Sequence, residues 1–337
     1  MDFQKLKKFL TERGAMNFRH KQCTQALFNP KVRTWTDSTV LDKDLREELA
    51  REIVFSEILN FDLREARDGS AKVLLNFAGD NVESVLMPAG EGRYVVCLSS
   101  QVGCAMNCSF CATGGLGFKR NLTAGEFAEQ FLFWWRWVYD HKPTAHLTGA
   151  VVMGMGEPLA NYENIADGLR FLIDGSGINA KHFSISTVGI TEGIVNMAQD
   201  KRLAGVNLAI SLHSADQAVR EQIIPTARTT KLPDLMRALQ EFYQKTEQKI
   251  FVEYLMLKNI NDSAEMAKKL ADLLKNPRRF HINLILYNPA RGGYRRSDAT
   301  QVSAFQEVLR ERGFDCTRRH SWGEEIQGAC GQLAGSV

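Results

Sequence analysis

The feature that most constrains the fold is a regular alternation of short apolar runs with amphipathic segments, which begins near Arg93. The apolar runs have strand length, and the segments between them have the spacing of amphipathic helices. Successive strand–helix repeats form a parallel sheet with right-handed crossovers. The pattern therefore predicts an α/β fold, a partial (β/α)6 barrel with its chemistry at the carboxyl ends of the strands. The six runs cover residues 94–98, 150–153, 182–186, 206–211, 250–256 and 281–286.

Two smaller regions precede this barrel. Residues 1–61 show helical spacing of apolar residues and predict a small helical accessory domain. Residues 62–92 change to alternation, with Gly79 and Asp80 between two runs, which predicts a β-hairpin extension. Residues 93–337 then form the catalytic barrel and a C-terminal tail.

Composition excludes few functions. The formal net charge of +3 neither demands nor excludes a nucleic-acid partner. The first residues lack the apolar core of a signal peptide, and no apolar run reaches the length of a membrane span. Seven cysteines, an odd number, argue against a secreted disulfide framework. We therefore expect a cytoplasmic protein without a membrane partner.

Three of these cysteines, Cys104, Cys108 and Cys111, stand close together in the run CAMNCSFC. A tight loop with this spacing can direct three thiolates at three corners of a [4Fe–4S] cube and leave the fourth iron open for substrate. A zinc site and three unrelated core cysteines are the alternatives. Zinc sites usually show two paired Cys/His elements, so the compact triplet favours the iron–sulfur cluster.

Polar and glycine residues follow several of the predicted strands. The second run ends in MGMGEPLAN, where Gly156 lets the backbone approach a ligand and Glu157 supplies a carboxylate suited to an amino group. Each such residue is also compatible with an ordinary turn or strand end. Their common position on one rim makes them candidate ligand contacts. The residues in these positions are Gly154, Gly156, Glu157, Ser186, Thr187, Ser211, Leu212, His213 and Asn288.

Six segments together resemble the radical S-adenosylmethionine adenine methyltransferases of the RlmN and Cfr type, in order and spacing. The resemblance covers nearly the whole chain and is closest to RlmN. It implies that the three loop cysteines Cys104, Cys108 and Cys111 bind the [4Fe–4S] cluster. The S-adenosylmethionine contacts that it implies are Gly156, Glu157, Ser186, Ser211, Leu212, His213 and Asn288. The segments are VCLSSQVGCAMNCSFCATGGLGFKRNLTAGE, VVMGMGEPLAN, FSISTVGI, NLAISLHSAD, INLILYNP and GACGQLAG.

The resemblance also implies three catalytic residues outside the cluster. Cys330 matches the cysteine that carries the methyl group, and Cys97 matches the cysteine that resolves the protein–RNA adduct by closing a disulfide. Glu83 matches a proposed proton acceptor. Considered alone, Cys97 is typical of core packing and Cys330 of a flexible tail, so only the pair indicates this mechanism.

The substrate implied is carbon 2 of an adenosine in 23S ribosomal RNA, with transfer RNA as a second substrate of some members. The partners implied are an external electron donor such as flavodoxin or ferredoxin, and the chain is expected to be a monomer. A Cfr-type carbon 8 methyltransferase that confers antibiotic resistance is the alternative. A non-catalytic RNA-binding ribosome assembly factor is the alternative from another class.

Two groups of basic and aromatic residues offer contacts to RNA. Arginines can bind phosphates, and aromatic rings can stack on an extruded base. A solvated charged surface is the alternative for both groups. The first group is Arg291, Tyr294, Arg295 and Arg296, and the second is Arg318, Arg319, His320 and Trp322.

Overall fold

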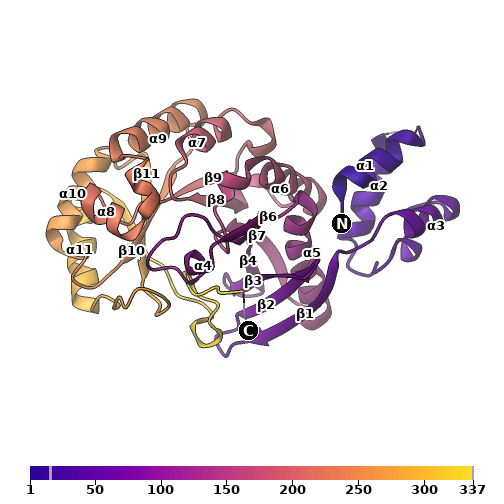
Figure 1. The fold of residues 1–337 in the computed structure, drawn as a ribbon, viewed down its shortest axis with the longest axis horizontal. Coiled ribbons are helices and arrows are strands. Elements are labelled where there is room, and N and C mark those ends of the chain that lie inside the picture. The colour runs from indigo at the N-terminus through magenta and orange to yellow at the C-terminus, as the bar shows by residue number, and fades with distance from the viewer. Residues whose placement is uncertain (15–16, 336–337) are drawn as a thin grey trace.

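The computed structural model describes residues 1–14 and 17–335, and its centre is a ten-stranded sheet (Figure 1). From β4 onward all neighbouring strands are parallel, whereas β1 to β4 are antiparallel. The edge strands β1 and β12 have one neighbour each, so the sheet is an open barrel, which confirms the predicted α/β class. In spatial order the strands are β1 (Ile58–Glu65), β2 (Ala71–Phe77), β3 (Asp80–Pro88), β4 (Arg93–Cys97), β7 (His146–Val152), β8 (Phe183–Thr187), β9 (Asn207–Ser211), β10 (Ile250–Met256), β11 (Phe280–Leu286) and β12 (Asp315–Arg318).

Helices cover the outside of the parallel strands, as Figure 1 shows. The helix α5 (Ala124–His141) begins at a capping box formed by Thr123 and Glu126. It buries Phe131 and Trp134 against the sheet, as expected for an amphipathic crossover helix. No helix in the described ranges is long and apolar enough to cross a membrane. The later helices are α6 (Tyr162–Ser176), α7 (Thr191–Met197), α8 (Gln217–Ile223), α9 (Leu232–Thr246), α10 (Ala264–Leu274) and α11 (Ala299–Glu311).

The N-terminal helices α1 (Phe3–Glu12), α2 (Asn17–Phe28) and α3 (Lys43–Glu52) lie at one side of the barrel (Figure 1). They are fixed to α5 by polar contacts. The Met1 amino group forms an ion pair with Glu129, and the Trp135 indole donates to the Phe28 carbonyl at 2.9 Å.

Four strands and a short helix are additions to the sequence-based expectations. The predicted hairpin corresponds to β2 and β3, and β1 adds a third antiparallel strand that starts before residue 62. Most β1 side chains are exposed, so β1 lacks the alternation that marks a half-buried strand. The strand β12 buries only Cys316. A separate two-stranded sheet, β5 (Gln101–Gly103) with β6 (Phe118–Asn121), and the helix α4 (Ala112–Gly115) flank the cysteine loop.

Candidate active site

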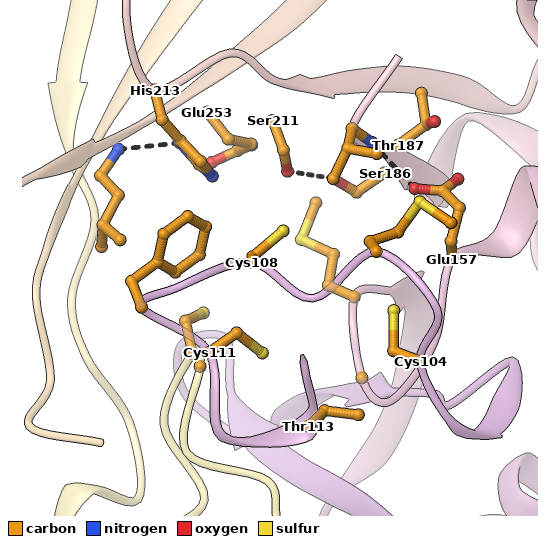
Figure 2. Close-up of a pocket in the computed structure, with 18 of the residues that line it drawn as sticks. Cys104, Cys108, Cys111, Thr113, Glu157, Ser186, Thr187, Ser211, His213 and Glu253 are labelled. Atoms are coloured by element: carbon orange, nitrogen blue, oxygen red, sulfur yellow. Dashed lines mark hydrogen bonds between the residues drawn. The ribbon is translucent and has the colours of Figure 1, made fainter. Parts of the chain in front are cut away.

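The carboxyl ends of the parallel strands surround a cavity of about 150 Å³. Figure 2 shows the cysteine loop on one side of this pocket and the strand-end residues on the other. The cavity brings together most of the residues that the sequence singled out. These are Cys104, Cys108, Cys111, Gly156, Glu157, Ser186, Ser211, His213 and Cys330.

The cysteine loop is held from both sides by backbone contacts. The Cys104 amide donates to the Gly117 carbonyl at 2.9 Å, and the Ser109 amide donates to the Ile223 carbonyl at 3.0 Å. Gly103, just before the loop, has a φ of 72°, and a Cβ there would lie 1.9 Å from the Gly117 carbonyl oxygen. Only glycine therefore allows this close approach.

The three thiols supply a donor set that suits iron and sulfide. Burial raises the pKa of Cys104 to about 11 and that of Cys108 well above its usual value, so both stay protonated until a metal displaces the proton. Among the described residues, no three His, Cys, Asp or Glu side chains are grouped to hold a single metal ion. Three soft sulfur ligands from one loop, all facing the same space, fit a cluster with several irons.

Glu157 is a buried carboxylate at the pocket wall. Its Oε1 accepts from the Leu159 amide at 3.0 Å and its Oε2 from the Val188 amide at 2.9 Å. Burial outweighs these hydrogen bonds and raises the pKa of Glu157 to about 7. The preceding Gly156 has a φ of 99°, which a side chain would disfavour. This wall can therefore pair with a cationic group brought in by a ligand.

Hydroxyl groups and a neutral imidazole lie on the same strand-end side of the cavity as Glu157 (Figure 2). The Ser186 and Ser211 hydroxyls lie 3.2 Å apart. Burial, and then the charge of Arg220, lower the pKa of His213 to about 3, so its ring is uncharged. Its Nδ1 accepts from the Leu255 amide at 3.1 Å, which fixes the ring. These groups offer hydrogen bonds to a neutral polar part of a ligand.

Two of the predicted contacts do not lie on the cavity wall. Leu212 is fully buried in the hydrophobic core. Asn288 donates to the Cys330 carbonyl at 3.3 Å and accepts from Arg296 at 2.8 Å. In this structure Asn288 therefore holds the C-terminal tail.

Cys330 and Cys97 share a second cavity of about 350 Å³, and Cys330 also lines the first one. Both thiols are free. Desolvation by the surrounding protein raises the pKa of both thiols and brings that of Cys97 to about 12, although the Cys330 side chain is exposed at the surface. The positive charge of Arg319 opposes the rise of the pKa in each thiol. Arg319 lines the second cavity together with the indole of Trp322. The arrangement lets one thiol face two separate ligands.

Glu83 is not among the residues that line either cavity in the described part of the chain. It is fully buried, and its Oε1 lies 2.7 Å from the Lys72 ammonium nitrogen. Its Oε2 accepts from the Gly335 amide at 3.0 Å. Glu83 therefore anchors the end of the tail in this structure.

Glu253 is a cavity residue that the sequence reasoning missed. It interrupts the apolar strand β10, is 3% exposed, and lines the first cavity. Its Oε1 accepts from Asn283 at 2.8 Å and lies 3.5 Å from Arg319, whereas its Oε2 has no hydrogen-bond partner within residues 1–14 and 17–335. A charged residue inside an otherwise apolar strand was the available signal.

A parallel sheet with three cysteine thiols facing its strand ends defines the class of radical S-adenosylmethionine enzymes. In agreement, the family model described as "Radical SAM superfamily" matches residues 98–274. The crystal structure of a radical SAM methyltransferase from Sphaerobacter thermophilus superposes with a TM-score of 0.91 at 33% identity, covering 100% of this chain and 98% of that one.

Similarity to curated relatives identifies the family within this class of enzymes. The probable dual-specificity RNA methyltransferase RlmN of Salinibacter ruber is 38% identical, covering 98% of this chain and 91% of the relative. The ribosomal RNA large subunit methyltransferase N of Nitrosopumilus maritimus is 34% identical, covering 98% of this chain and 96% of the relative. The chain belongs to the RlmN family of radical S-adenosylmethionine methyltransferases. It uses a [4Fe–4S] cluster and S-adenosylmethionine, which confirms the cofactor prediction.

Proposed function

We propose that this enzyme methylates carbon 2 of an adenosine in 23S ribosomal RNA, and the same carbon of an adenosine in certain transfer RNAs, through a methyl group carried on Cys330. The observation that carries the proposal is the position of Cys330 between two cavities, one shared with the cluster cysteines and the other with Cys97. A single-displacement methyltransferase has no need for such a thiol pair.

We assign Cys104, Cys108 and Cys111 to the cluster and the cavity wall to S-adenosylmethionine. Glu157 accepts a hydrogen bond from the amino group of the methionine moiety, because its carboxylate is buried at the cavity wall. Gly156, Ser186, Ser211 and His213 form the rest of the wall. Leu212 and Asn288 act indirectly: Leu212 holds its neighbours in register, and Asn288 hydrogen-bonds to the Cys330 backbone.

When bound, the cluster supplies the electron that cleaves S-adenosylmethionine to a 5′-deoxyadenosyl radical. Before that step the Cys330 thiol loses its proton and its sulfur takes a methyl group from a first S-adenosylmethionine, leaving S-adenosylhomocysteine. The methyl group on Cys330 then loses a hydrogen atom to the 5′-deoxyadenosyl radical, which becomes 5′-deoxyadenosine, and the resulting carbon radical bonds to the adenine ring. Adenine carbon 2 is electron-poor and does not attack a sulfonium methyl directly, so the carrier thiol is required.

Cys97 releases the product. The adduct first gives up one electron, which returns to the electron carrier, and one ring proton, so that aromaticity is restored. The Cys97 thiolate then attacks the Cys330 sulfur, an S–S bond forms, and the C–S bond breaks with its electron pair left on the CH2 carbon, which takes up a proton to become the methyl group. An external thiol reductant reopens the disulfide. For Glu83 to accept the ring proton, the tail must first release the Gly335 amide from its carboxylate.

We further propose that the enzyme is a cytoplasmic monomer that takes its electron from a flavodoxin or ferredoxin. The basic groups around Tyr294 and Trp322 remain our candidates for contacts to RNA. Of these, Arg319 and Trp322 border the second cavity, where the target adenine would have to reach the Cys330 methyl group.

Binding of S-adenosylmethionine should depend on the charge of Glu157. Because the pKa of Glu157 is about 7, the carboxylate is mostly ionised at pH 8 and mostly protonated at pH 6, so affinity should fall as the pH is lowered. Glu157→Gln should weaken binding about tenfold or more at pH 8 and remove this pH dependence. Equilibrium dialysis against the reconstituted enzyme measures both effects.

The matched control for this prediction is Glu163→Gln, which changes an exposed carboxylate on α6. It should leave affinity and its pH dependence unchanged. Equal affinity of the wild type and Glu157→Gln at pH 8 would contradict the assignment.

The product identifies the function. In a deletion strain, nucleoside mass spectrometry of 23S ribosomal RNA and transfer RNA should show 2-methyladenosine only after the gene is restored, and the Cys330→Ala gene should not restore it. Restoration of 8-methyladenosine alone would assign the chain to the Cfr-type activity. No change in either nucleoside would favour the assembly-factor alternative.

A further inference from the structure

Arg220, on α8, is a buried cation for which the described residues offer no acidic partner. Its side chain is 0% exposed and forms no ion pair with a described carboxylate. Its Nε donates to the Leu212 carbonyl at 3.2 Å, and one terminal nitrogen donates to the Val188 carbonyl at 2.6 Å. The other terminal nitrogen has no hydrogen-bond partner among the residues that the structure describes.

Such a charge is costly to bury. Two carbonyl dipoles orient the guanidinium but carry no net negative charge, and a buried ion normally requires a partner of opposite sign. Burial lowers the pKa of Arg220 only to about 10, so the group stays protonated at neutral pH. The protein alone therefore leaves a positive charge in its interior uncompensated.

Among the described residues, the acidic group whose charge acts on Arg220 is the thiol of Cys108. Cys108 packs in one apolar cluster with Ile223, which lies one helical turn after Arg220, and the Ser109 amide donates to the Ile223 carbonyl at 3.0 Å. Val188 supplies one of the two carbonyls that hold Arg220, and His213 directly follows Leu212, which supplies the other. Val188 and His213 both line the cluster cavity.

We infer that Arg220 supplies the buried positive charge that compensates the thiolate-ligated cluster and raises its reduction potential. With three thiolate ligands the oxidised cluster already carries net negative charge, and the electron accepted from a low-potential donor adds to it. A nearby fixed cation stabilises the more negative, reduced state more than the oxidised one. The inference rests on the proposed ligation by Cys108.

The test compares Arg220→Gln, which removes the charge, with Arg220→Lys, which keeps it. The measurement is an EPR-monitored redox titration of the full-length, anaerobically reconstituted protein, at matched iron and sulfide content. In Arg220→Gln, the ratio of reduced to oxidised cluster at a fixed potential should fall at least about tenfold, a shift of about 59 mV to more negative potential. Arg220→Lys should stay closer to the wild type. The control Arg237→Gln changes an exposed arginine on α9 and should have no effect.

An unchanged potential in fully loaded Arg220→Gln would overturn the inference, as would equal shifts in the Gln and Lys variants, since those would report hydrogen bonding alone. If Arg220→Gln does not retain a cluster, the test depends on Arg220→Lys. Wild-type cluster content and reduction potential in Arg220→Lys support the role of charge. A loss of the cluster equal to that in Arg220→Gln overturns the inference. If the loop cysteines do not ligate the cluster, a variant that lacks them will still contain a normal cluster. This result distinguishes failure of the proposed ligation from failure of the inference about Arg220.

Discussion

Replacing Cys104, Cys108 and Cys111 together with alanine should reduce the iron and sulfide content of the reconstituted protein to background and abolish methylation. All three thiols come from one loop and line one cavity, the arrangement expected for the ligands of one cluster. Iron and sulfide analysis with Mössbauer spectroscopy measures the cluster directly.

The matched control for this triple variant is a Cys23→Ala and Cys316→Ala double variant. Both side chains are buried away from the two cavities, and burial raises the pKa of each thiol to about 12. The control should retain a normal cluster. A normal cluster in the triple variant, or zinc as the bound metal of the wild type, would refute the assignment.

The second large effect is expected at the two thiols of the second cavity. Cys97→Ala should accumulate protein covalently joined to RNA, because the resolving sulfur is gone while Cys330 still delivers its carbon. Cys330→Ala should lose methylation by at least about 10³-fold and form no crosslink, because the carrier itself is absent. Denaturing gels with labelled RNA and mass spectrometry of the Cys330 peptide distinguish the two outcomes.

A Cys97→Ala and Cys330→Ala double variant provides the control for this pair. It should behave like Cys330→Ala alone, because the resolver acts only after the carrier. Free methylated RNA released by Cys97→Ala at the wild-type rate would exclude Cys97 as resolver. An unmethylated Cys330 in enzyme under turnover would exclude the carrier role.

The parts of the fold that were predicted correctly are those that bury an apolar face. The six central strands are marked by runs such as residues 250–256, and the structure places β10 over the same residues. The strands β1 and β12 were not predicted because their side chains are mostly exposed, so backbone pairing at the sheet edges forms them without a hydrophobic pattern.

The candidate site also contains residues that could be predicted from the sequence and residues that could not. Parallel strands end on a common rim, which correctly predicted that Glu157, Ser186 and Ser211 meet around one cavity. The position of strand ends does not predict contacts that depend on the direction of a side chain or on segments distant in the sequence. The sequence does not reveal that Asn288 hydrogen-bonds to the backbone of the C-terminal tail. It also does not reveal that Arg220 on α8 is fully buried.

The contacts of the C-terminal tail also bear on how the enzyme is assembled in the cell. The Ala112 amide donates to the Gly331 carbonyl at 2.8 Å, and the Thr113 hydroxyl donates to the Leu333 carbonyl at 2.6 Å, so the tail rests on the residues that directly follow the last loop cysteine. A scaffold protein that delivers the cluster needs access to this same loop. We therefore expect cluster delivery to precede closure of the tail, so that apoprotein with a closed tail accepts a cluster more slowly than protein whose tail is open.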